Sequence, residues 1–383
     1  MWLDAGPGHN GRMKITKLEW RGVQVPLRSA SPWPHGRSKD RYGLLLWIFT
    51  DEGFVGVGEA SPVGPSSGDG ISEVASLLHD LAPSAIGMSP TLAFDVLSSL
   101  APHTTAGSLL RLGLDTATVD LLGQQAIRPV ADLLGGVIDW VPMNASLDFL
   151  EPAEAAAKAV EAVAGGYPCV KLSLGSRDPD VDVEVVRRVR EAIGYDVSLR
   201  ADGDEIWTAE QAIEVLRRLE PYDLEFVEQP VIAEDLTGMA KIRRSVAVPI
   251  AADEAVWTLA DAENVVAAGA ADVLVVKPTR AAGLREAYAI LEFARDNGVG
   301  AVVDSSMETG VGIAAALHLA TALGPARACG LGTGLLLEHD MLKNPLVPVR
   351  GHITVPQMPG LGVEIDHDAV DHYTTGVMGV ISG

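Results

Sequence analysis

The chain has 383 residues, of which 48% are hydrophobic, and carries a formal net charge of −22. This excess of acidic residues argues against nucleic acid and anionic membranes as partners. No apolar run reaches the ~18 residues of a membrane span, and the first residues lack the basic start and apolar middle of a signal peptide, so we expect a cytoplasmic protein. The two cysteines, Cys169 and Cys329, lie in short apolar runs typical of buried free thiols.

The first region, residues 13–138, has the pattern of an α+β unit. Lys14–Leu27 alternates like a half-exposed strand, and a hairpin signal lies between Tyr42–Thr50 and Phe54–Glu59. Helical periodicity then covers three stretches: 71–85, 90–100 and 107–126. A meander followed by helices indicates a separate α+β domain.

From residue 139 the pattern changes to strand-like runs that alternate with amphipathic helices. The eight runs are 142–147, 169–174, 197–201, 224–227, 249–252, 273–276, 299–303 and 328–331. With seven helices between them, they predict an α/β fold with a (β/α)8 TIM-type barrel over 139–340; a doubly wound sheet is the alternative. The Gly- and Pro-rich tail, 341–383, is expected to return to the first domain.

Four charged residues, Asp202, Glu228, Asp253 and Lys277, follow one another at intervals of 26, 25 and 24 residues. Each closes a short apolar run, and about 25 residues suit one strand, one helix and two loops. The C-terminal ends of barrel strands meet at one face, so these groups should converge. Three converging carboxylates would repel one another without a cation, and oxygen ligands favour Mg²⁺, with Mn²⁺ as an alternative.

Two lysines are expected to be catalytic. Lys277 comes one unit after the third predicted ligand, so it should face the substrate across the metal. Desolvation and a nearby cation would lower its pKa and make a neutral amine available as a base. Lys171 lies on the second predicted strand, where period-two geometry puts it on the same inward face as Ser173, which we expect beside the substrate. A buried salt bridge is the alternative role for Lys171.

Polar residues also end the last two predicted strands. Asp304, Ser305, Ser306 and Glu308 follow the seventh, and this cluster favours contact with the substrate. Capping of the helix that starts at 310 is the alternative. Gly332 lies in the glycine-rich run 330–334 after the eighth strand, where we expect a close backbone approach beside the substrate.

Five motifs carry a resemblance that covers nearly the whole chain. They are Leu-Arg-Ala-Asp202, Phe-Val-Glu228-Gln-Pro, Ile-Ala-Ala-Asp253-Glu254, Val-Val-Lys277-Pro and Ser305-Ser306-Met-Glu308-Thr-Gly. The chain therefore resembles the enolase superfamily, in the muconate lactonizing enzyme subgroup, and is most similar within it to o-succinylbenzoate synthases and muconate cycloisomerases. The resemblance implies that the N-terminal unit is a capping domain completed by the C-terminal tail.

The resemblance also implies the chemistry of the site. Mg²⁺ would be bound by Asp202, Glu228 and Asp253, and a proton α to a carboxylate would be removed to give a metal-stabilised enediolate. The substrate would be a small-molecule carboxylate. Subgroup members often form dimers or octamers, so a homo-oligomer is expected.

One position departs from the subgroup, whose second strand normally reads Lys-x-Lys. Here the second lysine, an acid/base catalyst in the subgroup, is replaced by Ser173. Racemisation needs a base on each face, so this change favours one-sided proton abstraction followed by β-elimination or cycloisomerisation. Two alternatives stay open: a racemase or epimerase of N-acyl amino acids or dipeptides, and a non-catalytic barrel that binds metal and a carboxylate.

Overall fold

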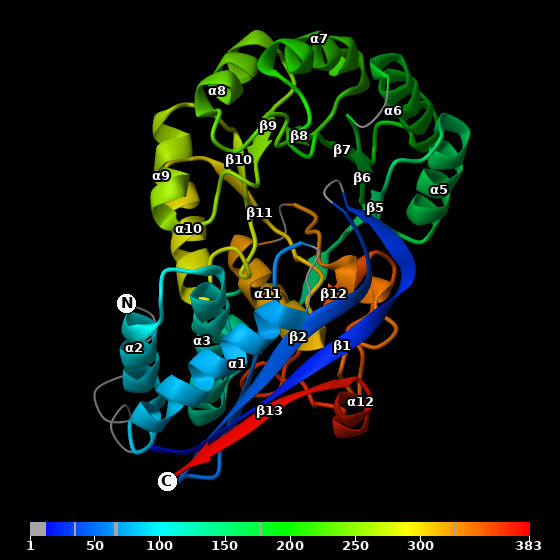
Figure 1. The fold of residues 1–383 in the computed structure, drawn as a ribbon. Coiled ribbons are helices and arrows are strands. Elements are labelled where there is room, and N and C mark those ends of the chain that lie inside the picture. Colours follow the sequence, from blue (N-terminus) through cyan, green and yellow to red (C-terminus); the bar gives the residue numbers. More distant parts are fainter. Residues whose placement is uncertain (1–12, 34–35, 65–67, 176–177, 325–326) are drawn as a thin grey trace.

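The computed structural model describes residues 13–33, 36–64, 68–175, 178–324 and 327–383. Its elements form a cap and a barrel, and the C-terminal strand lies in the cap (Figure 1). None of the helices in the described part of the chain is long and apolar enough to cross a membrane.

An antiparallel sheet with the strand order β13-β1-β2-β3 forms the cap. Its strands are β1 (Ile15–Trp33), β2 (Gly36–Thr50), β3 (Val55–Ala60) and β13 (Thr374–Ser382). Alternate residues of β2, among them Leu44 and Leu46, are buried in the cap core with residues of the helices α1 (Gly68–Leu81), α2 (Pro90–Leu100) and α3 (Thr105–Ala126). The predicted helix over 71–85 ends early and continues as the 3-10 turn Ala82–Ala85, because Pro83 lacks the N–H donor that a longer α-helix needs.

A parallel sheet curls into the barrel, and Figure 1 shows its helices in an arc around it. The strands are β5 (Asn144–Leu147), β6 (Cys169–Ser173), β7 (Ser198–Asp202), β8 (Phe226–Glu228), β9 (Ile250–Ala252), β10 (Val273–Val276) and β11 (Gly300–Val303). The helices are α5 (Pro152–Ala164), α6 (Pro179–Ile193), α7 (Ala209–Leu219), α8 (Leu236–Ser245), α9 (Leu259–Ala267), α10 (Leu284–Asp296) and α11 (Gly310–Ala320).

The predicted eighth strand, 328–331, is not a regular strand. Two single parallel bridges, Met143 to Cys329 and Asp304 to Gly330, join this segment to both sides of the sheet and close the barrel. The fold class predicted from the sequence is thereby confirmed: α/β, with a TIM-type barrel and an α+β cap.

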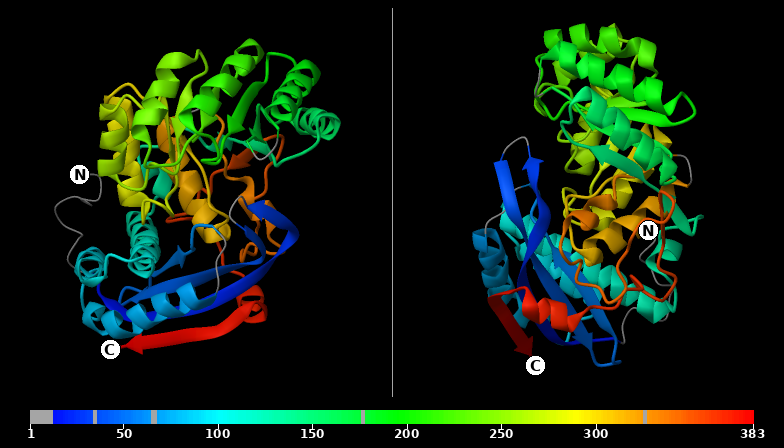
Figure 2. Two further views of the ribbon diagram at one scale, coloured as in Figure 1. Left: turned by 45° about the horizontal axis from the view of Figure 1, so that its top comes forward. Right: turned by 90° about the vertical axis from the view of Figure 1, so that its right-hand side faces the viewer.

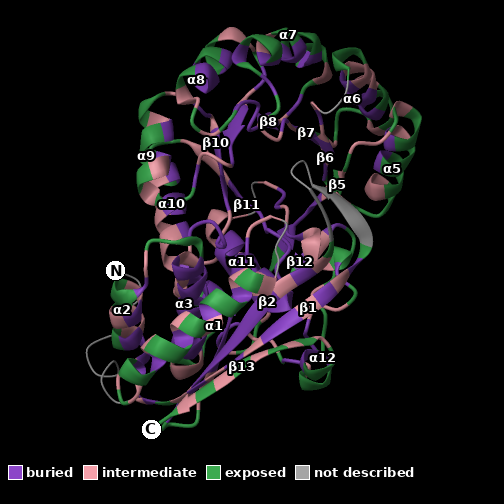
Figure 3. Ribbon diagram, viewed as in Figure 1, coloured by how far each residue is buried: buried purple, intermediate pink, exposed green. Residues whose placement is uncertain are grey.

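The barrel strands bury side chains on both of their faces. Apolar side chains from alternate strand positions occupy its interior: Phe226, Ala251, Val273, Val275 and Val302. Because side chains alternate along a strand, the other set faces the helices and is buried with them. Figure 3 shows the strands as mostly buried and the outward faces of the helices as exposed. The charged strand ends above the apolar layer form the barrel mouth.

The cap sheet lies beside the barrel in both views of Figure 2, and several junctions join the two. Glu59, at the end of β3, accepts hydrogen bonds from the backbone N–H of Thr309 and Gly312, at the start of α11. The short helix α4 (Val130–Leu133) follows α3, and β4 (Trp140–Pro142) pairs with β12 (His352–Thr354). The helix α12 (His367–His372) precedes β13.

Leu361 lies at the centre of one junction, which we call the Leu361 clamp (Asp120, His318 and Leu361). Its N–H donates to Asp120 Oδ1 at 2.7 Å, and its carbonyl accepts from His318 Nε2 at 3.0 Å. The other carboxylate oxygen of Asp120 accepts from the Val57 N–H at 2.8 Å, and His318 Nδ1 accepts from the Ala131 N–H at 3.1 Å. Burial raises the pKa of Asp120 to about 6 and lowers that of His318 to about 4.

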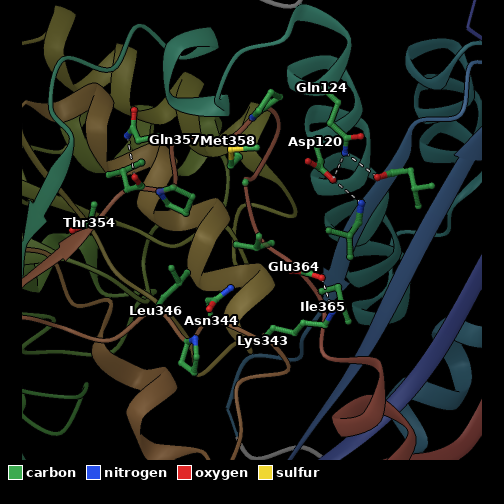
Figure 4. A pocket seen from close by; sticks show the side chains of 18 of the residues that line it. Asp120, Gln124, Lys343, Asn344, Leu346, Thr354, Gln357, Met358, Glu364 and Ile365 are labelled. Atoms are coloured by element: carbon green, nitrogen blue, oxygen red, sulfur yellow. Dashed lines mark hydrogen bonds and ion pairs between the residues drawn. The ribbon is translucent and has the colours of Figure 1, made fainter.

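A cavity of about 1080 Å³ lies beside this clamp, between the outer face of β2 and β3 and the C-terminal segment 343–367. Figure 4 shows Asp120 and Gln124 on one side of it and Lys343 and Glu364 on another. None of the residues predicted from the sequence for the catalytic site lines this cavity.

Candidate active site

The four residues of the charged ladder stand at the C-terminal ends of consecutive barrel strands. Asp202 and Glu228 are the last residues of β7 and β8 and are register partners. Asp253 and Lys277 follow β9 and β10 directly. Glu228 and Asp253 are almost fully buried, with 1% and 2% of their surfaces exposed. The strand ends therefore bring the predicted ligands to one face, as the spacing predicts.

Lys171, on β6, joins two of the three predicted metal ligands. Its Nζ lies 2.8 Å from Asp202 Oδ2, 2.7 Å from Glu228 Oε2 and 3.8 Å from Asp304 Oδ2. Burial opposes the charge on this amine, but the carboxylates outweigh burial and raise its pKa well above the usual value. The salt-bridge role left open for Lys171 is the arrangement seen here, in which the amine is a cation.

The third predicted ligand, Asp253, is held by two cations. Lys277 Nζ lies 2.5 Å from its Oδ2, and Arg280 Nη1 lies 2.5 Å from its Oδ1. A second guanidinium nitrogen of Arg280 contacts Glu254 at 2.5 Å. Although burial opposes ionisation, Arg280 and Lys277 hold the pKa of Asp253 well below its usual range.

The pKa of Lys277 is raised in the arrangement seen here. Burial and the neighbouring Arg280 lower it, but the charges of Asp253, Glu228 and Glu254 outweigh them. The lowered pKa expected from the sequence depends on a cation bound beside the amine, and it stays a prediction. Positive charge added near these carboxylates would offset them and lower the pKa of Lys277.

Carboxylates outnumber cations at the barrel mouth. Asp202, Asp204, Glu228, Asp253, Glu254 and Asp304 are in contact or in Coulombic interaction with the three cations Lys171, Lys277 and Arg280. Burial and neighbouring charge raise the pKa of Asp204 to about 8 and that of Glu254 to about 7. The cluster is thus short of positive charge.

Two observations test whether these residues suit a divalent cation. Glu228 Oε1 and Asp253 Oδ1 are buried and have no hydrogen-bond partner, although Arg280 lies close to the latter. Carboxylate oxygens with open lone pairs are the donors that Mg²⁺ prefers. In the arrangement seen, no three Asp, Glu, His or Cys side chains among the described residues lie close enough together to hold an ion. The donor set and its charge fit Mg²⁺, whereas the side chains are now arranged around the lysines.

The predicted substrate-binding residues Asp304, Ser305 and Ser306 follow the seventh barrel strand, and each has a hydrogen-bond partner. The Gly330 N–H donates to Asp304 Oδ1 at 2.6 Å, and the Ser305 hydroxyl bonds to the Gly330 carbonyl at 2.8 Å. Asp304 also approaches Lys171, so it lies at the mouth. The Ser306 hydroxyl accepts from Thr279, on the loop after β10.

The substrate contacts predicted for Glu308 and Gly332 stay predictions, and their surroundings are as follows. Glu308 is buried and turns back to accept from the Ser306 N–H at 2.7 Å, and the Glu59 and Arg41 charges of the cap act on its carboxyl. Gly330 lies close to Asp304, since an added Cβ at Gly330 would lie 2.6 Å from the Asp304 carboxylate. At Gly332, the nearest atom to such a Cβ is 4.0 Å away.

Two residues near the ladder were missed in the sequence. Arg280 follows Lys277 by three residues, and Asp148 follows the first barrel strand. The Ser173 side chain interacts with the Asp148 carboxylate and acts to lower its pKa. The signal that could have found Asp148 is its place directly after a predicted strand, where every residue of the ladder also lies.

Comparisons with known proteins give a consistent family. The model described as "Enolase C-terminal domain-like" matches residues 154–369, and the N-terminal domain model of mandelate racemase and muconate lactonizing enzyme matches residues 22–135. The hydrophobic dipeptide epimerase of Enterococcus faecalis is 32% identical over 297 residues, which are 76% of this chain and 82% of that protein. The chloromuconate cycloisomerase of Cupriavidus pinatubonensis is 29% identical, over 92% of this chain and 96% of that protein.

A similar solved structure is that of the dipeptide epimerase from Cytophaga hutchinsonii, complexed with Mg and the dipeptide D-Ala-L-Val. It superposes with a TM-score of 0.84 at 28% identity, and the match covers 96% of this chain and 99% of that one.

Proposed function

Because the chain belongs to the enolase superfamily, in the muconate lactonizing enzyme subgroup, we propose that it removes the proton α to the carboxylate of a small-molecule substrate, with Mg²⁺ as its cofactor. The observation that carries this proposal is the convergence of Asp202, Glu228 and Asp253 with a lysine on each side. The proposal includes a homo-oligomeric state, as the family resemblance implies.

Asp202, Glu228 and Asp253 would hold the ion. The unpartnered Oε1 of Glu228 and the excess of carboxylates support this assignment. When bound, Mg²⁺ would neutralise the negative charge that develops on the substrate carboxylate as the α-proton leaves.

Lys277 is the proposed base. It stands at the end of β10, on the opposite side of the barrel from Lys171 on β6, since these are the second and sixth of the eight segments that close the barrel. Arg280 and Lys277 both bind Asp253, so the amine is fixed beside the place where the substrate carboxylate would lie. Lys171 would act on the other side as a cation that orients the substrate.

A single base serves β-elimination or cycloisomerisation, and Ser173 favours these outcomes. Racemisation or epimerisation of N-acyl amino acids or dipeptides is the second candidate. It is supported by the similarity to two dipeptide epimerases, one of them solved with Mg and a dipeptide.

A screen in D₂O with Mg²⁺ tests the proposal. The panel contains muconates, the cyclohexadiene precursor of o-succinylbenzoate, N-succinyl amino acids and dipeptides, read by mass spectrometry. We expect deuterium uptake or product with one class, and Lys277→Ala should lose the product or the uptake from at least one configuration of the substrate. Binding of a panel carboxylate with no uptake and no product would instead support a barrel that binds its ligand without catalysis.

A further inference from the structure

The strand register places Asp148 in a transverse row with two of the predicted metal ligands. Ser146 and Leu147 of β5 pair with Lys171 and Leu172 of β6, so the next residue, Asp148, stands beside Ser173. Ser173 in turn pairs with Asp202, and Asp202 pairs with Glu228. Asp148 therefore extends the ladder by one more strand, on the side of the barrel opposite Lys277.

The side chain of Asp148 faces the barrel mouth. Leu147 packs against the core between strands and helices, so its neighbour points the other way, toward the side of Lys171 and Ser173. Ser146 and Asp148 are both exposed, whereas Glu228 and Asp253 are buried, so a substrate in the mouth can reach Asp148. Within the described part of the chain, no lysine or arginine lies at ion-pair distance from it.

The Asp148 carboxylate also has a partner that orients it. The Ser173 side chain interacts with it and acts to lower its pKa, and Ser173 stands where the subgroup carries its second lysine. Partial desolvation raises the pKa of Asp148 and the charge of Asp202 adds to this, whereas Lys171 and Ser173 lower it.

We infer that Asp148 is the second proton-transfer group of the site, oriented by Ser173, and that the protein inverts an α-carbon by using Lys277 on one face and Asp148 on the other. This inference rests on the proposed function and decides between its two candidates.

The step is balanced in both directions. Lys277 Nζ takes the α-proton from one face as the C–H bond breaks, and the carboxyl of protonated Asp148 gives a proton to the opposite face as the new C–H bond forms. In the reverse direction, the Asp148 carboxylate accepts the proton and the Lys277 ammonium supplies one. The substrate class is an α-chiral carboxylate such as an N-acyl amino acid or a dipeptide.

The test follows α-deuterium uptake separately from each configuration. The full-length protein with Mg²⁺ is incubated in D₂O with N-succinyl-L- or N-succinyl-D-amino acids, and with dipeptides that differ only in the configuration of the C-terminal residue. The variants are Asp148→Asn, Asp148→Glu, Ser173→Ala and Lys277→Ala. Glu151→Gln is the matched control, because it removes one exposed carboxylate three residues away, outside the site.

We expect Asp148→Asn to lose uptake from one configuration by roughly 10²-fold or more, while uptake from the other configuration continues through Lys277. Lys277→Ala should show the opposite preference, and Asp148→Glu should restore part of the lost uptake. Ser173→Ala should weaken the same configuration as Asp148→Asn by a smaller factor, and Glu151→Gln should match the unmodified protein.

Equal uptake from both configurations in Asp148→Asn and in the unmodified protein would overturn the inference and leave the proposed function intact. An unmodified protein that exchanges neither configuration, but converts a muconate or the cyclohexadiene in a Lys277-dependent way, would overturn it in favour of the one-base reaction. No uptake and no product with any panel compound would overturn the proposed function as well.

Discussion

The buried titratable groups of the Leu361 clamp and those of the barrel mouth differ in how fully they are hydrogen-bonded. Both oxygens of Asp120 and both ring nitrogens of His318 have backbone partners. At the mouth, Glu228 Oε1 is equally buried and has no hydrogen-bond partner, and Asp253 Oδ1 has only the ion pair with Arg280. A buried polar group without a partner is costly, and a protein retains it where a ligand supplies the partner. The clamp is therefore expected to stabilise the fold, and the mouth is the proposed place for ligand.

The largest expected effect comes from a substitution at the barrel mouth that leaves the Leu361 clamp unchanged. Lys277→Ala removes the proposed base, so Lys277-dependent proton exchange or turnover should fall by about 10²–10⁴-fold. Asp253 keeps its contact with Arg280, so the thermal unfolding midpoint should stay close to that of the unmodified protein. A variant that lost stability in proportion to activity would show that Lys277 serves the fold.

The converse substitution removes contacts of the Leu361 clamp and leaves the barrel mouth unchanged. His318→Ala leaves a cavity at a fully buried position and removes the partners of the Ala131 N–H and the Leu361 carbonyl. The free energy of unfolding should fall by about 3–4 kcal/mol, as measured by urea denaturation. Exchange activity per folded molecule should be unchanged, and a specific loss of activity would contradict the division between the two regions.

The affinity for Mg²⁺ also distinguishes the barrel mouth from the Leu361 clamp. Asp253→Asn removes one proposed ligand charge, so the Kd for Mg²⁺ should rise about 100-fold or more, equivalent to about 2.7 kcal/mol. Isothermal calorimetry measures this, with Asp120→Asn as the control, because that carboxylate is also buried but lies in the clamp. Equal Mg²⁺ affinities in the unmodified protein and Asp253→Asn would exclude Asp253 as a ligand.

The smallest expected effect is the pH dependence of the stability that the clamp residues Asp120 and His318 contribute. The raised pKa of Asp120 gives stability that is present at low pH and is lost as pH rises toward about 6. The lowered pKa of His318 gives stability that is present above its unfolded pKa of ~6.5 and is lost as pH falls toward about 4. Between pH 5 and 6.5 the two contributions change by about 1–2 kcal/mol each, in opposite directions.

Variants separate these two contributions. The destabilisation caused by Asp120→Asn should be larger at pH 5 than at pH 6.5, and that caused by His318→Gln should be larger at pH 6.5. Urea denaturation at both pH values measures the two trends. Trends of the same sign would show that one of the pKa shifts has the wrong direction.

The sequence predicted the parts of the fold and the site that depend on local periodicity. The alternation of strands and helices predicted the barrel, and equal spacing predicted that Asp202, Glu228 and Asp253 converge. Parity within β6 correctly put Lys171 and Ser173 on one face. These features repeat along the chain, so a single strand's pattern carries them.

Contacts between distant strands could not be predicted in this way. The eighth barrel segment is held by only two bridges, which no propensity of residues 328–331 reveals. The raised pKa of Lys277 sums charges from several loops, and the burial of Glu308 against Glu59 and Arg41 depends on how the cap docks. Each outcome depends on residues far away in the chain.

The pairing of β1 with β13 has a consequence for synthesis of the chain. Lys17 pairs with Ser382, so one edge of the cap sheet has no partner until a further 365 residues have been made. At about 5–20 residues per second, a ribosome needs roughly 20–70 s to supply it. During that time the barrel can form ahead of the cap, and an exposed strand edge is open to chaperones or to unwanted pairing with another nascent chain.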